Sequence, residues 1–228
     1  ADIIIEAVPE RLSAKQSVYD EIELSANNNS IIASSTSGIL PSDLQAKMKH
    51  PERLIVAHPF NPVYLLPLVE IVGGSKTSQE LIERASSIFT NVGMFPLHIK
   101  KEIPAFIADR LLESVWREAL WLVNDDVATT EEIDDAIRFG FGLRWAQMGL
   151  FETYRLAGGE AGMRHFISQF GPCLEWPWTH LMDVPEFTEE LVDKVSSQSD
   201  EQSGQFSIHE LEKKRDDNLV DFLKVLKE

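Results

Sequence analysis

Short apolar runs alternate with longer amphipathic stretches in the first part of the chain. The runs cover residues 2–8, 30–36, 53–60, 66–74 and 94–100. Several are apolar without interruption, which is typical of strands covered on both faces of a sheet. The stretches between them predict helices over residues 11–26, 40–49 and 78–93. Strands that alternate with helices indicate βαβ units and a largely parallel sheet.

Two of these helices carry local signals. Over residues 11–26, the apolar side chains that lie roughly on one side are Leu12, Val18, Ile22 and Leu24. Over residues 78–93, Ser78 is suited to cap the first turn and Gly93 to end the last one.

After Pro104 the pattern becomes helical. Amphipathic stretches predict helices over residues 105–128, 129–140, 148–158, 160–171, 188–199 and 207–228, with a polar connection over 196–207. Thr129 and Glu132 have the spacing of a capping box. We therefore predict an α/β fold, an incomplete Rossmann-type parallel sheet in residues 1–103 followed by an all-helical domain in residues 104–228.

The chain opens with a buried-type strand, "ADIIIEAV", and without methionine. Such a strand rarely begins a domain, so we expect that a segment before it is missing.

Composition narrows the classes of partner and compartment. A formal net charge of -16 disfavours nucleic acid and anionic membranes as partners. Apolar runs do not approach the ~20 residues of a membrane span. A single cysteine, Cys173, excludes an internal disulfide framework and favours a reducing cytoplasm.

Two candidate catalytic residues lie on two neighbouring predicted strands. His58 follows the apolar run "RLIVA", and Glu70 lies inside the run that comes next. Ligands of open α/β sheets bind beyond the carboxyl ends of the strands. A histidine there can act as a general base near neutral pH, and a carboxylate can hold its ring. The residues alone also allow a buried structural histidine.

A family resemblance rests on the order and spacing of three motifs: "HPFNP", "LPLVEIV" and "EIPAFIADRLL". Together they resemble the 3-hydroxyacyl-CoA dehydrogenase superfamily. Further stretches, including "WPWTHL", are similar to its L-carnitine 3-dehydrogenase branch, with the L-gulonate 3-dehydrogenase and lambda-crystallin group next. The resemblance implies NAD as the cofactor and a homodimer formed through the helical domain. The Gly-x-Gly-x-x-Gly turn that binds the dinucleotide phosphates in such enzymes does not occur in this sequence.

The resemblance also implies roles for particular residues. It makes His58 the acid/base and Glu70 its partner, with Ser37 and Asn61 beside the reacting groups. It places Glu10, Lys15 and Ser35 at the cofactor. Solvated charges at a helix start remain an alternative for Glu10 and Lys15. A local hydroxyl turn remains an alternative for the serines of the stretch "SSTSG". We expect no metal.

Asp109 stands where the acyl-CoA enzymes usually have asparagine. An aspartate suits a cationic substrate such as L-carnitine, whose trimethylammonium group also favours aromatic faces. The other side chains that we expect in the substrate pocket are Phe60, Ile107, Ala108, Trp145 and Phe170. A surface ion pair is the alternative for Asp109. The partner of the substrate carboxylate stays open among Arg144, Arg155 and Arg164.

Other functions stay open as well. The chain could oxidise L-gulonate or another short 3-hydroxy acid, or a 3-hydroxyacyl-CoA. It could also be a non-catalytic dimer like lambda-crystallin, although such a protein gains nothing from a buried base.

Overall fold

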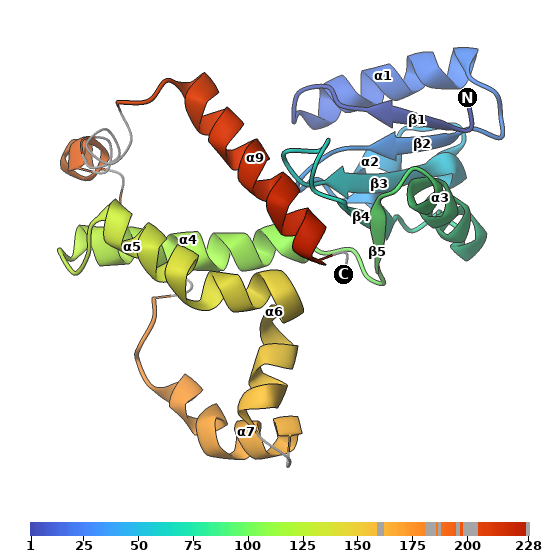
Figure 1. Cartoon of the computed structure of the whole chain (residues 1–228). Coiled ribbons are helices and arrows are strands. Elements are labelled where there is room, and N and C mark those ends of the chain that lie inside the picture. The colour runs from blue at the N-terminus through green and yellow to red at the C-terminus, as the bar shows by residue number, and fades with distance from the viewer. Residues whose placement is uncertain (159–161, 181–185, 187, 195–196, 198–204, 227–228) are drawn as a thin grey trace. The chain divides into compact units, whose positions relative to one another are not determined.

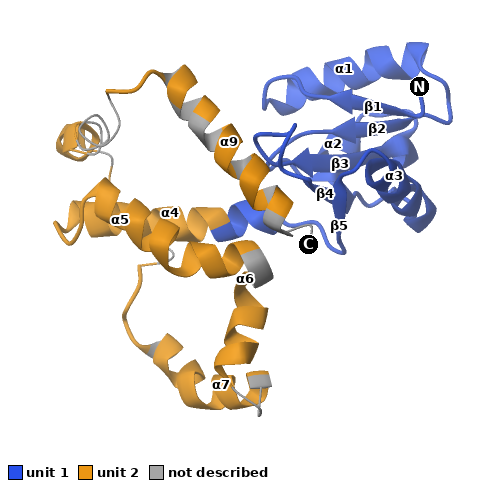
Figure 2. Cartoon of the chain, viewed as in Figure 1, with its two compact units in different colours: residues 1–111 blue, residues 112–228 orange. Residues whose placement is uncertain are grey.

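The structure is a computed structural model that describes residues 1–158, 162–180, 186, 188–194, 197 and 205–226 (Figure 1). The chain divides into two compact units, residues 1–111 and residues 112–228 (Figure 2). Unit 1 contains a sheet with its covering helices. The described part of unit 2 is helical.

A five-stranded sheet forms the centre of unit 1, and its strands lie side by side in chain order. They are β1 (Ile3–Glu6), β2 (Ile31–Ser34), β3 (Leu54–Pro59), β4 (Leu68–Gly73) and β5 (Phe95–Ile99). β1, β2 and β3 are parallel, as are β4 and β5, whereas β3 and β4 are antiparallel. The predicted α/β class with a largely parallel sheet is confirmed, and each predicted run contains one strand.

Helices cover both faces of this sheet (Figure 1). They are α1 (Leu12–Ser25), α2 (Pro41–Gln45) and α3 (Gln79–Asn91), with a short 3₁₀ helix, Pro51–Arg53, before β3. Tyr19 of α1 and Leu44 of α2 pack on one face, in a core that includes Phe106. Ile82 and Phe89 of α3 pack on the other face. Coverage on both faces explains why the strands are nearly continuous apolar runs.

The buried side of α1 agrees only in part with the apolar side seen in the sequence, since Ile22 packs against the core that includes Tyr19. Leu12 and Leu24 are exposed, and the buried side chains of α1 are Lys15, Gln16 and Tyr19. Helix α1 therefore turns polar groups toward the carboxyl ends of β1 and β2. The physical reason is that Lys15 and Tyr19 find hydrogen-bond partners there, described below with the site.

The predicted ends of α3 are confirmed. The Ser78 hydroxyl accepts a hydrogen bond from the backbone N–H of Leu81 at 3.2 Å. Gly93 follows the helix with φ +87°, a left-handed conformation that favours glycine.

The helices of the rest of the described chain match the predicted change after Pro104. They are α4 (Ala108–Asn124), α5 (Thr130–Ala136), a π-helical turn (Ile137–Phe141), α6 (Gly142–Ala157), α7 (Gly162–Phe170), a 3₁₀ helix (Gly171–Glu175) and α9 (Ile208–Leu226). The capping box of Thr129 and Glu132 is present. Most of the predicted connection over 196–207 lies outside the described residues. Among the described residues, no helix has both the length and the apolar character of a membrane span.

Candidate active site

The carboxyl ends of β1, β2 and β3 meet at one edge of the sheet because these strands are parallel. Glu6 pairs with Ser34 across β1 and β2, and Ser34 pairs with Val56 across β2 and β3. His58 lies two residues beyond Val56 on β3, so it is level with the start of the loop after Ser34. This edge brings together polar and ionisable side chains from segments far apart in the sequence, at the place where open α/β sheets bind ligands.

His58 and Glu70 form a buried pair at this edge. They are direct partners in the antiparallel register of β3 and β4. Partners in such a register project their side chains to the same face at short range. His58 Nδ1 lies 2.9 Å from Glu70 Oε2, and the Glu70 side chain is 0% exposed. The predicted pair is therefore formed, and the spacing in the sequence follows from this register.

Glu70 also holds the start of α4. Its Oε1 accepts hydrogen bonds from the backbone N–H groups of Ile107 and Ala108, both at 3.0 Å. Burial favours the neutral carboxyl. The hydrogen bonds from His58 and from these two N–H groups outweigh burial and keep the pKa of Glu70 below its usual value. Glu70 is therefore a carboxylate near neutral pH.

The charge of Glu70 fixes which nitrogen of His58 carries the proton. An ionised carboxylate only accepts hydrogen bonds, so Nδ1–H must donate to Glu70. In the neutral ring, Nε2 then keeps its lone pair and can accept a proton. Asp109 Oδ2 lies 3.7 Å from this Nε2, and the Asp109 side chain is 24% exposed. Asp109 thus lies beside His58 at the start of α4, and its part in the substrate pocket stays a prediction.

Two aromatic rings border the His58 imidazole. The Phe60 ring lies edge-on at 5.4 Å between centroids, and the Phe106 ring lies at 5.5 Å. Phe60 was predicted here, but Phe106 was not. Phe106 is fully buried, and both it and Ala105 have positive φ, of 50° and 59°. This tight turn places the ring under His58 and the next two backbone N–H groups on Glu70.

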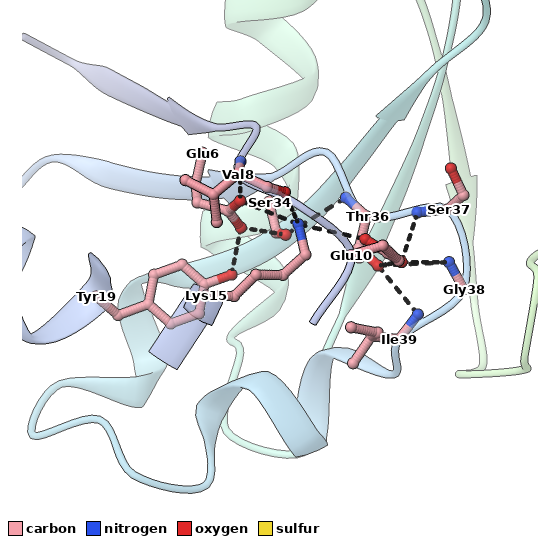
Figure 3. A network of polar contacts seen from close by, with 10 residues as sticks. All are labelled: Glu6, Val8, Glu10, Lys15, Tyr19, Ser34, Thr36, Ser37, Gly38 and Ile39. Carbon is pink, nitrogen blue, oxygen red and sulfur yellow. Dashed lines mark hydrogen bonds and ion pairs between the residues drawn. The ribbon is translucent and has the colours of Figure 1, made fainter. Parts of the chain in front are cut away.

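A second buried carboxylate, Glu6, lies at the end of β1 (Figure 3). Its Oε2 accepts hydrogen bonds from Tyr19 Oη and Ser34 Oγ, both at 2.7 Å. Its Oε1 accepts from the Val8 N–H at 2.7 Å and from Lys15 Nζ at 3.0 Å. Burial alone would favour the neutral form of Glu6. These four donors outweigh burial and lower its pKa.

The sequence did not indicate the roles of Glu6 and Tyr19. The signal available was an acidic residue at the end of an apolar run, "IIIEAV", next to a helix with a tyrosine in its middle. Burial raises the pKa of the Tyr19 phenol, so it remains a donor to Glu6.

Glu10 links this cluster to the loop after β2. Glu10 Oε2 lies 3.3 Å from Lys15 Nζ. Glu10 Oε1 accepts hydrogen bonds from the N–H groups of Ser37 at 3.2 Å and Gly38 at 3.3 Å, and from the Thr36 hydroxyl. Burial opposes the charge of Glu10, but the Thr36 hydroxyl and Lys15 lower its pKa.

The alternative of a solvated charge is wrong for Lys15, whose side chain is 1% exposed, whereas the Glu10 side chain is 48% exposed. The hydroxyl-turn alternative is present in part, because the Thr36 N–H donates to Ser34 Oγ at 3.4 Å. Ser35 is partly buried, and its N–H donates to the Glu6 carbonyl at 2.8 Å. Ser37 and Asn61 are exposed.

The remaining predicted pocket residues divide between the units. Ile107 and Ala108 follow the Phe106 turn in unit 1, and Ile107 is exposed. Trp145 and Phe170 belong to unit 2, where Trp145 contacts Phe141 and Phe170 contacts Phe166 through their rings. Their part in the site stays a prediction.

Family comparisons assign both parts of the chain. Residues 1–103 match the profile of the 3-hydroxyacyl-CoA dehydrogenase NAD binding domain. Residues 106–198 match the profile of the 3-hydroxyacyl-CoA dehydrogenase C-terminal domain.

Individual proteins are similar to the chain over nearly its whole length. The chain is similar to an L-carnitine dehydrogenase of Mesorhizobium japonicum, with 64% identity over 227 residues, 99% of this chain and 62% of that protein. It is 61% identical to an L-carnitine dehydrogenase of Pseudomonas putida over 227 residues, 100% of this chain and 70% of that protein. The chain thus spans less than two thirds of the length of the Mesorhizobium relative. The chain is also similar to a solved structure, with a TM-score of 0.83 and 27% identity over 100% of this chain and 74% of that one. That structure is of 5-formyl-3-hydroxy-2-methylpyridine 4-carboxylic acid 5-dehydrogenase, an NAD+ dependent dismutase.

Proposed function

The chain belongs to the 3-hydroxyacyl-CoA dehydrogenase family, and from this premise we propose that the full-length protein oxidises the 3-hydroxyl group of L-carnitine with NAD. The observation that carries the reaction class is the buried His58–Glu70 pair, with Nε2 of His58 able to accept a proton. The substrate comes from the relatives named L-carnitine dehydrogenase.

Oxidation of a secondary alcohol removes a hydride from the carbon and a proton from the hydroxyl oxygen, leaving a ketone. His58 Nε2 takes the hydroxyl proton. The imidazolium that results is stabilised by Glu70, which already accepts the Nδ1–H. The Ser37 hydroxyl and Asn61 are placed beside the substrate oxygen in this proposal.

NAD, when bound, supplies the nicotinamide that accepts the hydride. The residues of the sheet edge fit such a group, because Glu10 offers a half-exposed carboxylate to ribose hydroxyls beside the loop of Ser35. Lys15 supports Glu10 from the buried side. In this proposal residues 1–103 form the part of the nucleotide-binding domain that carries these groups.

Asp109 supports a cationic substrate. In L-carnitine one methylene group separates the ammonium nitrogen from the carbon that bears the hydroxyl. A hydroxyl bound at His58 Nε2 therefore brings the trimethylammonium group close to a carboxylate that lies 3.7 Å from this nitrogen. Phe60 adds an aromatic edge beside the same ring. Trp145 and Phe170 are further candidates for the wall of this pocket.

The helical domain, residues 104–228, is proposed to complete the substrate pocket and to pair two copies of the chain. The single cysteine is in keeping with a reducing cytoplasm, which we propose as the compartment.

The test follows NADH formation by the full-length gene product with L-carnitine, L-gulonate or a short 3-hydroxyacyl-CoA. We expect turnover of L-carnitine alone. In His58→Gln, we expect kcat to fall about a thousandfold, because the general base is gone. Turnover of L-gulonate or of the CoA ester instead would overturn the substrate, and wild-type kcat in His58→Gln would overturn the base.

A further inference from the structure

Lys15 has used its whole capacity for hydrogen bonding within the protein. An ammonium group has three N–H donors. The three acceptors around Nζ are Glu6 Oε1 at 3.0 Å, the Val8 carbonyl at 3.1 Å and Glu10 Oε2 at 3.3 Å. With a side chain that is also 1% exposed, Lys15 in this arrangement acts on neighbouring protein groups rather than on a ligand.

Glu6 is the rigid end of this arrangement. Its two oxygens receive four donors from three segments: the turn after β1, α1, which supplies two of them, and β2. A carboxylate with this many fixed donors has a single well-defined position. Lys15 lies between Glu6 and Glu10 (Figure 3). The side chain of Glu6 is fully buried and fixes Lys15, whereas that of Glu10 is about half exposed.

Glu10 transmits this position to the backbone of the loop after β2. Three donors of that loop, the N–H groups of Ser37 and Gly38 and the Thr36 hydroxyl, converge on one oxygen of Glu10. The same loop lies next to the turn that supports Glu70, since a Cβ added at Gly38 would come within 4.0 Å of the Ala105 nitrogen. The orientation of Ser37 is therefore set by a carboxylate held from the far side by Lys15.

We propose that Glu6 is a positioning residue that acts through Lys15 and Glu10 on the backbone of Ser37, and so places the Ser37 hydroxyl for the substrate. This inference rests on the proposed function for the part played by Ser37. Charges alternate along the path, from carboxylate to ammonium to carboxylate to backbone N–H. A glutamine at position 6 weakens the path, because it removes the negative charge that Lys15 Nζ contacts, although its NH₂ group can donate to the Tyr19 and Ser34 hydroxyls.

A double-mutant cycle tests the proposal in the full-length gene product. We expect Glu6→Gln to lower kcat/KM for L-carnitine at least tenfold in the wild-type background, the scale of a small misplacement of a reacting group. In the Ser37→Ala background we expect Glu6→Gln to change kcat/KM less than about twofold, since its target is gone. An equal loss in both backgrounds would overturn the proposal.

Tyr19→Phe is the matched control. It removes one donor to Glu6 on the side away from Lys15, so it should lower kcat/KM less than Glu6→Gln does. If Tyr19→Phe costs as much as Glu6→Gln, the loss reflects general packing of the cluster, and the proposal fails. Circular dichroism of each variant checks that the fold is retained.

A readout that needs no turnover separates this proposal from the proposed function. In amide NMR spectra of the isotope-labelled protein, Glu6→Gln should shift the Ser37 and Gly38 N–H resonances and speed their hydrogen exchange. Unchanged resonances would overturn the path from Glu6 to Ser37. If the wild type does not oxidise L-carnitine but these resonances respond, the proposed function fails and the path from Glu6 to the loop stands.

Discussion

Glu70 and Glu6 are two buried carboxylates on the same sheet, and they differ in the partner that each one holds. Both remain ionised because several donors outweigh the effect of burial on the pKa. Glu70 holds an imidazole through one nitrogen and leaves the other directed toward Asp109. Glu6 holds an ammonium group whose donors are all used.

The partner of a buried carboxylate decides what that carboxylate can do. A histidine can gain and lose a proton near neutral pH, so the pair on β3 and β4 can take part in a reaction. The three donors of Lys15 Nζ all face acceptors of the protein, so the cluster at the ends of β1 and β2 orients its neighbours. Removal of Glu6 leaves the buried Lys15 ammonium with one carboxylate fewer, and removal of His58 leaves the buried Glu70 carboxylate without its imidazole, so each change costs stability.

The largest expected effect comes from breaking the His58–Glu70 pair. In Glu70→Gln we expect kcat for L-carnitine to fall about a thousandfold. The amide has no charge to stabilise the imidazolium, and its NH₂ group must face either His58 or the N–H groups of Ile107 and Ala108. Steady-state kinetics of the full-length gene product measures this loss. A kcat within about threefold of wild type would show that Glu70 does not support proton transfer.

The second effect tests the Glu6–Lys15 pair. At pH 7, Glu6→Gln should lower the free energy of unfolding by about 3 kcal/mol, because Lys15 loses one of its two carboxylates. The wild type should also lose stability in acid. A lowered pKa means that Glu6 and Glu70 contribute stability that is fully present above the unfolded pKa of about 4.3 and is lost as the pH falls through the folded pKa.

Urea unfolding at a series of pH values between about 7 and 3 measures this dependence. In the acid part of the range the unfolded chain binds more protons than the folded protein, so wild-type stability falls with decreasing pH. Glu6→Gln removes one such group and should therefore show a shallower fall. Parallel curves for wild type and Glu6→Gln would mean that the pKa of Glu6 is not lowered in the folded protein.

The same two regions mark what the sequence could and could not predict. The strands were predictable because burial on both faces leaves nearly continuous apolar runs. His58 and Glu70 were predicted from the motifs that resemble the dehydrogenase superfamily, since the two residues alone also allowed a buried structural histidine. Helix α1 was predicted with Ile22 on its core side, but the burial of Lys15 was not, because Lys15 is buried by its bonds to Glu6 and Val8 rather than by apolar character.

Phe106 shows a different limit. Its place beside His58 depends on two successive residues with positive φ, Ala105 and Phe106, neither of which is glycine. Local propensity disfavours this conformation, and tertiary contacts of the buried ring and of the following N–H groups with Glu70 select it. Sequence patterns therefore locate a strand end better than they locate the loop that folds over it.

A third and smaller effect concerns the carboxylate that is only partly buried. Asp109 lies near His58 Nε2, but its side chain is 24% exposed, unlike those of Glu70 and Glu6. Asp109→Asn should raise KM for L-carnitine about tenfold, equivalent to about 1.4 kcal/mol, because the trimethylammonium group loses its counter-charge. The thermal midpoint should stay near that of wild type. An unchanged KM would remove Asp109 from the recognition of the cation.

The smallest effect comes from a site outside both pairs and provides the scale for the others. Ser78→Ala removes the cap of α3 and should lower the free energy of unfolding by about 1 kcal/mol. Helix α3 packs on the face of the sheet opposite Tyr19 and Phe106, so kcat and KM for L-carnitine should not change. A tenfold fall of kcat/KM in Ser78→Ala would show that loss of stability by itself disturbs the site around His58. The kinetic difference expected between Glu6→Gln and Tyr19→Phe would then not be evidence for the path through Lys15. If Ser78→Ala unfolds more easily but keeps its kcat and KM, stability of unit 1 does not control the kinetics. The difference between Glu6→Gln and Tyr19→Phe then reflects the position of individual groups.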